Sequence, residues 1–169
     1  MSEEVIVSKP PFSAWVTYVQ PEFEELKRRF PAYVYPGYKG KRFDPIARCK
    51  VVSKENCELD FEYVYMGRKA STDEVLAEMD RKCLRPALYE ELLGFAEVYP
   101  DEQLKYYIAA LGSETRVDGR RVAAYLCNDS RGSALDLHWI DYDWYKSFQF
   151  RFLAVRQRRL PDSGIICAV

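Results

Sequence analysis

Residues 71–96 read STDEVLAEMDRKCLRPALYEELLGFA and contain the strongest helix signals in the chain. Ser71 followed by Glu74 is a capping box, in which the serine side chain accepts a hydrogen bond from an amide of the first turn and the glutamate reaches back. Apolar residues then recur at helical spacing, and Arg85-Pro86 stops this helix and starts a second one. The segment predicts two short helices joined by a tight break.

Period-two alternation on both sides of this helical segment predicts strands. A further short helix is expected between Pro21 and Pro31. The expected strands cover residues 61–66, 107–112, 122–126, 135–139 and 151–155, the last with both faces buried. The order of an early strand, two helices and several later strands predicts an α+β fold.

Composition limits the function classes. The chain has 169 residues, with 25 Lys and Arg against 26 Asp and Glu, a formal net charge of −1. This balance argues against a polybasic nucleic-acid binder, and the 48% hydrophobic content argues against disorder. No apolar stretch approaches the roughly 18 residues of a membrane span, so no membrane insertion is expected.

The first ten residues carry Glu3 and Glu4 and have neither a basic region nor a long apolar run, so they do not predict a signal peptide. We expect synthesis in the cytoplasm, which is compatible with incorporation into a virion.

Common enzyme motifs are missing: the sequence has no GxGxxG, GxxxxGK[ST], HExxH or GxSxG. Any triad would need His138, the single histidine, and carboxylate chemistry or calcium binding would need Asp136, Asp141 or Asp143. The five cysteines form no CxxC pair, so neither a metal site nor a cofactor is predicted. A small carboxylate-dependent hydrolase remains the less favoured alternative.

Residues 125–150 have an unusual composition, with seven aromatics in 26 residues together with many Asp, Ser and Asn. Tyrosine mixed with small polar residues is typical of antibody-like recognition surfaces, where tyrosine supplies rigid contact area. The acidic residues are also asymmetric: all fifteen Glu lie in residues 1–114, whereas residues 115–169 contain six Asp and no Glu. The preference of Asp for turns explains part of this bias.

Four motifs in order carry a family resemblance: Arg85-Pro86-Ala87 with Glu90-Glu91-Leu92-Leu93, then Ala110-Leu111-Gly112-Ser113, then Leu135-x-Leu137-x-Trp139-x4-Trp144, then Arg151-Phe152-Leu153-Ala154-Val155-Arg156. Together they resemble the variable proteins of diversity-generating retroelements, in particular those of archaea and their viruses. The resemblance covers about residues 61–157.

This resemblance implies a C-type lectin fold, with two short helices packed on small antiparallel sheets and a loop-rich variable face. It also implies that a reverse transcriptase copies a template repeat, substitutes at adenines and rewrites the 3′ end of the gene. Mutated AAC or AAT codons encode Asn, Asp, Tyr, Ser, His, Phe, Ile and Gly but never Glu, Gln, Lys or Trp, which accounts for the missing Glu. By the same rule Trp139, Trp144, Lys146 and Gln149 are framework or come from other codons.

The resemblance assigns roles within a variable region of about residues 125–156. The expected variable, ligand-binding positions are Tyr125, Asn128, Asp129, Ser130, Asp136, His138, Asp141, Tyr142, Asp143, Tyr145, Ser147, Phe148 and Phe150. The expected scaffold positions are Leu135, Leu137, Trp139, Trp144, Arg151, Phe152, Leu153 and Val155, and all of them except Arg151 are expected to be buried. Tyr142, Tyr145 and His138 are placed near the centre of the binding patch.

Two departures from related folds limit what is carried over. The EPN or QPD tripeptide of sugar-binding C-type lectins is missing, and Trp139-Ile140-Asp141 matches their WND triplet only in part, so calcium-dependent sugar binding is not implied. No cysteine pair matches the formylglycine-generating enzymes that share the fold.

The sequence thus predicts a lectin-like domain over residues 61–169, with residues 1–60 as an N-terminal extension packed on it. The predicted function is non-enzymatic binding of a protein or glycan surface, for instance in a virion tail or at a cell surface. The main alternative is a structural or assembly protein whose aromatic residues form the core.

Overall fold

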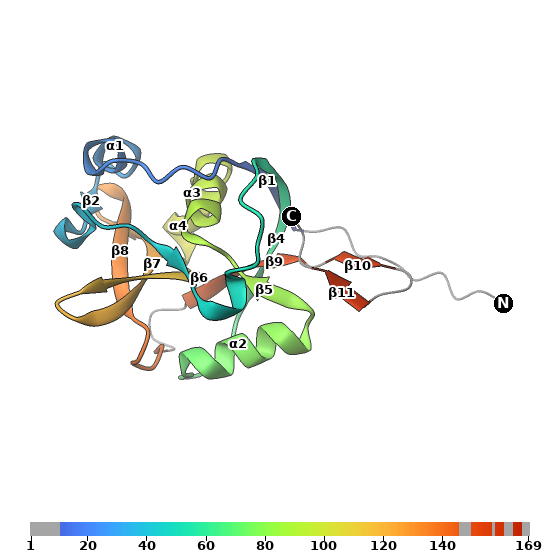
Figure 1. The fold of residues 1–169 in the computed structure, drawn as a ribbon. Helices are drawn as coiled ribbons and strands as arrows, with labels where there is room; N and C mark the ends of the chain where they lie inside the picture. Colours follow the sequence, from blue (N-terminus) through green and yellow to red (C-terminus); the bar gives the residue numbers. More distant parts are fainter. Residues whose placement is uncertain (1–10, 146–149, 157, 161–163, 167–169) are drawn as a thin grey trace.

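The computed structural model of the chain describes residues 11–145, 150–156, 158–160 and 164–166. The fold is a mixed α/β fold with one large sheet and few helices (Figure 1). The helices are α1 (Phe23–Arg29), α2 (Thr72–Arg81), α3 (Tyr89–Val98) and α4 (Glu102–Lys105), with 3-10 turns η1 (Pro36–Tyr38) and η2 (Ala47–Cys49). The strands are β1 (Phe12–Val16), β2 (Tyr33–Val34), β3 (Asp44–Pro45), β4 (Cys57–Val64), β5 (Leu84–Pro86), β6 (Tyr107–Val117), β7 (Arg120–Asp129), β8 (Gly132–Trp139), β9 (Phe150–Arg156), β10 (Arg158–Leu160) and β11 (Gly164–Ile166).

Nine of these strands form a single sheet in the order β1-β4-β9-β6-β7-β8-β2, with β3 added to β6 and β5 added to β9. The sheet is mixed, because β6 pairs with β9 and β2 pairs with β8 in parallel. The expectation of small antiparallel sheets is therefore wrong for the main sheet, which is large and mixed; among the described residues, the antiparallel β10–β11 pair forms a small separate sheet.

The N-terminal segment belongs to the same sheet. β4 runs across the expected boundary at residue 60, and β1 pairs along its length with β4. At the far edge β2 pairs with β8. Residues 12–60 thus contribute both edge strands of the sheet, and their buried side chains share its main core.

The two predicted helices exist, but they are not joined by a simple break. α2 ends at Arg81, and Cys83 adopts a left-handed backbone conformation with φ of 60°. The chain then forms β5, which pairs with β9, before α3 begins at Tyr89. Arg85-Pro86 is therefore part of a strand, and the helices pack on opposite faces of the sheet (Figure 1).

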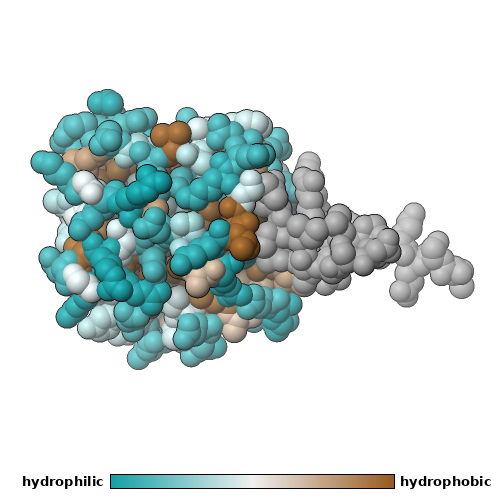
Figure 2. All heavy atoms as spheres, in the orientation of Figure 1, coloured by the Kyte–Doolittle hydropathy of each residue, from teal (hydrophilic) through white to brown (hydrophobic). Residues whose placement is uncertain are grey.

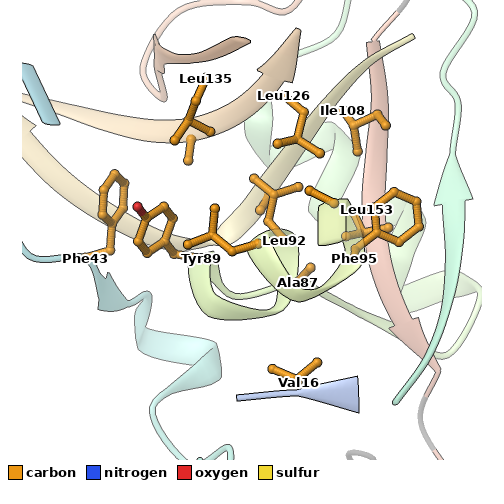
Figure 3. Packing of buried hydrophobic residues seen from close by; sticks show 14 of the residues in the cluster. Val16, Phe43, Ala87, Tyr89, Leu92, Phe95, Ile108, Leu126, Leu135 and Leu153 are labelled. Atoms are coloured by element: carbon orange, nitrogen blue, oxygen red, sulfur yellow. The ribbon is translucent and has the colours of Figure 1, made fainter. Parts of the chain in front are cut away.

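Each face has its own core. α3 places Leu92 and Phe95 against Leu126, Leu135 and Leu153 of the sheet (Figure 3). The buried residues of the opposite face are Val64, Ala70, Val75, Met79, Leu84, Ala109, Leu111, Ala123, Ile140, Trp144, Phe150, Phe152 and Ala154. Because β9 supplies residues to both cores, its near-continuous apolar sequence is explained.

The first two sequence motifs meet at the N-terminus of α3. The Glu91 carboxylate is fully buried and accepts hydrogen bonds from Arg85 at 2.8 Å, from the Leu88 amide at 2.7 Å and from the Tyr18 hydroxyl at 2.7 Å. The Ser113 hydroxyl accepts from the Tyr89 amide at 2.9 Å. These residues cap α3 from inside the protein.

Gly112 fixes how closely β6 approaches the start of α3. A Cβ atom at this position would lie 2.5 Å from the carbonyl oxygen of Ala87 and 2.7 Å from that of Pro86. The same approach allows the Gly112 amide to donate to the Ala87 carbonyl at 2.8 Å. Only glycine fits here without moving backbone, which gives the Ala110–Ser113 motif a structural role.

Figure 2 shows a face that is mainly hydrophilic, with small and separate hydrophobic areas. Within the described residues, no helix is both long enough and apolar enough to span a membrane.

Candidate recognition surface

The structure divides the predicted variable residues into separate groups. Asn128, Asp129 and Ser130 lie at the β7–β8 turn, whereas Tyr142 and its neighbours follow the opposite end of β8. At a rise of about 3.3 Å per residue, the length of β8 separates these ends by roughly 23 Å. The eleven predicted positions that the structure describes are therefore spread over both ends of β8, and Ser147 and Phe148 lie outside the described residues.

Turn geometry explains the residues at the β7–β8 end. The Asp129 carboxylate accepts from the Arg131 amide at 2.7 Å and pairs with the Arg131 guanidinium at 3.1 Å. Asn128 donates to the carbonyl of Gln103 at 2.7 Å, which links the turn to α4. Ser130 is exposed. Asn128 and Asp129 are thus engaged in local structural contacts.

A second group lies on the sheet face that also carries α2. His138 stacks on Trp144 with ring centroids 4.0 Å apart, and Phe150 packs edge-on against Trp144 at 4.8 Å. Tyr125 packs against Phe150 at 5.2 Å. Phe150 is only 5% exposed, so its expected role as a ligand-binding residue is wrong; it is part of the core.

The polar groups of this face are partly desolvated. Burial raises the pKa of Asp136 above its usual range, although the Leu137 amide and the Tyr125 hydroxyl both donate to its carboxylate. Burial likewise lowers the pKa of His138, whose Nδ1 lies 2.8 Å from the carbonyl oxygen of Trp139. The His138 ring therefore packs against Trp144 and Phe150 and is only partly accessible to a ligand.

The loop formed by residues 139–145 is fixed at two buried points. The Ile140 amide donates to the Arg121 carbonyl at 3.0 Å. Trp144 is 2% exposed, and its backbone exchanges hydrogen bonds with Ala70 at 2.7 and 3.1 Å. The hydroxyl of Thr72, at the start of α2, donates to the Ile140 carbonyl at 2.7 Å and accepts from the Trp144 indole at 2.9 Å.

Side chains between and beside these fixed points are directed into solvent. Tyr142 is 49% exposed and Tyr145 48% exposed. Asp141 forms an ion pair with Arg121 at 3.6 Å, and Asp143 forms one with Lys69 at 3.4 Å. The 139–145 loop therefore combines a rigid backbone with exposed aromatic and acidic side chains.

The sequence interpretation expected Trp139 to be a buried scaffold residue, and this expectation is wrong. Trp139 is 46% exposed and is the last residue of β8. Its ring lies 5.4 Å from that of Tyr142, and the Arg120 guanidinium lies over both rings, at 5.3 and 5.8 Å. We call Arg120, Trp139 and Tyr142 the Arg120 stack.

The remaining expected scaffold residues occupy interior or half-buried positions. Leu135, Trp144, Phe152, Leu153 and Val155 are buried, and Leu137 is half-buried against the main core. Arg151 is half-buried, with its guanidinium 3.8 Å from the centroid of the Tyr65 ring and 4.3 Å from that of Tyr106.

Arg120 is a residue that the sequence interpretation missed. It follows Asp118 and Gly119, which both have positive φ, and Asp-Gly is a strong signal for a two-residue hairpin turn. That signal places Arg120 opposite Val117 at the tip of the β6–β7 hairpin. Its pairing with Trp139 could not be read from the sequence, because it depends on the register of β7 on β8.

The three candidate acidic side chains make separate contacts. Asp136 lies on the sheet face with Tyr125, whereas Asp141 forms an ion pair with Arg121 of β7 and Asp143 forms one with Lys69, which precedes α2. Among the described residues, no group of three or more histidine, cysteine or acidic side chains has the arrangement of a metal site.

Comparison of the chain with protein-family models, with curated proteins and with solved structures found no match. The assignment of a function therefore depends on the residues and geometry of the chain itself.

Proposed function

We propose that this protein is a non-enzymatic ligand-binding protein that presents a retroelement-diversified surface on a C-type lectin scaffold. Its partner is a protein or glycan surface, for example one met by a virion tail. The 139–145 loop carries the proposal: buried contacts of Ile140 and Trp144 fix its backbone, while Asp141, Tyr142, Asp143 and Tyr145 take no part in the core. Exposed residues on a fixed backbone can change with little cost to folding.

The order of the elements supports the C-type lectin part of the proposal. The early strand β4 pairs with the late strand β9, and the helices α2, α3 and α4, with the short strand β5, separate β4 from the run of strands β6 to β8. The motifs that carry the resemblance are mainly internal: Arg85, Glu91 and Gly112 fix the α3 junction. A constant frame of this kind is what a diversified loop requires.

One observation favours the alternative of an assembly protein, because Trp144, Phe150 and Phe152 are core residues. That alternative, however, places Tyr142 and Tyr145 in the core as well, and both are about half exposed. The exposed tyrosines therefore support a recognition role, since tyrosine in a surface loop supplies contact area at low entropic cost.

The test is to sequence the source DNA downstream of the gene. The proposal expects a near-copy of the codons for residues 125–156, differing only where the copy has adenine, next to a reverse-transcriptase gene. The codons for Tyr142 and Tyr145 should fall among the variable positions, and those for Ile140 and Trp144 should not. A complete flanking sequence without such a repeat would overturn the retroelement assignment and favour the assembly protein.

A further inference from the structure

Arg120 is held in a defined position without an ionic partner. Its guanidinium lies over the Trp139 and Tyr142 rings, and its Nη1 donates weakly to the Tyr142 hydroxyl at 3.4 Å. Within the described part of the chain, no carboxylate lies within ion-pairing distance of Arg120. The adjacent Arg121 differs, because it pairs with both Glu114 and Asp141.

A cavity of about 480 Å³ lies beside this guanidinium. Arg120 and Trp139 line it together with the aliphatic side chains of Val122 and Leu137, and Tyr35 lines it as well. Its size lies within the range of about 300–1,000 Å³ that is usual for ligand pockets. The cavity thus combines an apolar wall, an aromatic ring and an unpaired cation.

We infer that this cavity binds an acidic side chain of a partner protein, with the apolar residue next to it packed on Trp139. A guanidinium fixed by aromatic rings presents a planar fork of donors that matches a carboxylate, and little side-chain entropy remains to be lost on binding. This inference depends on the proposed function, because it names the chemistry of the partner for the same surface.

The position of the cavity relative to the variable region supports a constant anchor. Arg120 precedes residue 125, where the proposed variable region begins, and adenine substitution in AAC or AAT codons does not produce Trp139. Tyr142, by contrast, is a proposed variable position that completes the Arg120 stack. Different variants would thus share the Arg120–Trp139 part of the carboxylate-binding anchor, and variants at residue 142 would differ in how far the guanidinium is held.

Two carboxylates belong to the cavity lining and must be considered. The Asp136 carboxylate accepts hydrogen bonds from the Leu137 amide and from the Tyr125 hydroxyl on the opposite face of the sheet, but both donors are neutral, so its charge also opposes an acidic group. Asp118 is exposed at the hairpin tip with φ of 51°. Its charge opposes the binding of an acidic group, so removing it should strengthen binding.

The experiment is an NMR titration of the full chain with two matched peptides, acetyl-Phe-Glu-amide and acetyl-Phe-Gln-amide. They differ only in a carboxylate against a carboxamide. We expect saturable shifts of the Trp139 indole and Arg120 side-chain signals, with the Glu peptide binding roughly tenfold more tightly, the lower range for a charge-assisted hydrogen bond. Inorganic sulfate serves as an anion without an apolar part and should bind more weakly than the Glu peptide.

Matched variants then test the assignment. Arg120→Gln should remove the preference for the Glu peptide, and Arg120→Lys should retain only part of it because the planar fork is lost. Asp118→Asn should tighten binding of the Glu peptide by roughly twofold, and asparagine tolerates the positive φ. Arg131→Gln, at the far end of β8, is the control and should change neither affinity.

Equal affinity for the two peptides, equal binding of sulfate and the Glu peptide, or an unchanged preference in Arg120→Gln would overturn the inference. These outcomes are separable from failure of the proposed function, which is decided by the flanking DNA. A template repeat together with no preference for the Glu peptide would leave the diversified surface standing and remove only the carboxylate anchor.

Discussion

The α3 junction, formed by Arg85, Glu91, Gly112 and Ser113 at the N-terminus of α3, and the 139–145 loop are both held by buried polar contacts. The two regions differ in whether their side chains are buried as well. At the junction, Arg85, Glu91 and Ser113 are themselves buried, so backbone and side chains are fixed together. In the loop only Ile140 and Trp144 are buried, and the side chains between them remain in solvent. The comparison distinguishes a region that specifies the fold from one that presents residues on it.

The largest expected effect lies at the junction. Arg85→Ala removes the partner of the buried Glu91 carboxylate, and we expect the free energy of unfolding to fall by about 3–5 kcal/mol. Urea denaturation measures this loss. The double variant Arg85→Met with Glu91→Leu removes both charges but also leaves the Leu88 amide and the Tyr18 hydroxyl without their acceptor, so it should recover only part of the loss. A single-variant loss below about 1 kcal/mol would contradict the role of this pair.

An intermediate effect is expected where the loop is anchored. Thr72→Val keeps the shape of the side chain but leaves the Ile140 carbonyl and the Trp144 indole without the hydroxyl that joins them. Leaving buried polar groups unpaired should cost about 2 kcal/mol in urea denaturation. Thr72→Ser retains the hydroxyl and should cost clearly less. Equal losses in both variants would show that packing rather than hydrogen bonding anchors the loop.

A small effect on stability is expected for the exposed tyrosines. Tyr142→Ala combined with Tyr145→Ala should lower the free energy of unfolding by no more than about 1 kcal/mol, because surface substitutions rarely cost more. The same variant should lose binding to a ligand of this surface, since aromatic anchors dominate interfaces. Chemical denaturation and a binding titration measure the two quantities. A loss of about 3 kcal/mol or more for each tyrosine would instead place them in the core and support an assembly protein.

The sequence predicted local structure better than it predicted exposure. The capping serine at residue 71, the strand from residue 135 to 139 and the strand buried on both faces all exist, because they depend on nearby residues. β5 was missed because it is three residues long and exists through pairing with β9. Trp139 was misplaced because alternation shows which residues share a face, but not where the cover over that face ends.

The candidate site shows the same limit. The composition of residues 125–150 correctly directed attention to Tyr142 and Tyr145, which are exposed. It grouped them with Phe150, which is buried, because composition contains no information on depth. Arg120 lies outside that segment in the sequence. The register of β7 on β8, which pairs Val122 with Trp139, brings Arg120 next to it.

The smallest expected effect is a dependence of stability on pH. It tests whether the His138 side chain is partly buried, unlike the exposed side chains of the 139–145 loop. Burial lowers the pKa of His138, so between that pKa and the ordinary value of about 6.5 the unfolded chain binds more protons than the folded one. The contribution of neutral His138 to the free energy of unfolding is therefore fully present above about pH 6.5 and is lost as the pH is lowered through this window. His138 is the single histidine in the chain, so its contribution can be isolated.

The measurement is the melting temperature of the protein and of His138→Phe between pH 7.5 and 5.5. Between pH 7.5 and 5.5 the melting temperature of the wild-type protein should fall by about 1–2 °C more than that of His138→Phe. The difference is small because the ring is partly solvated and the effect is screened. The raised pKa of Asp136 acts in the opposite direction, since stability falls as the pH rises through its window above about 3.8. Asp136→Asn separates the two groups. Identical slopes for the wild-type protein and His138→Phe would mean that His138 is solvated like the loop residues, and His138 would then return to the list of candidate contact residues.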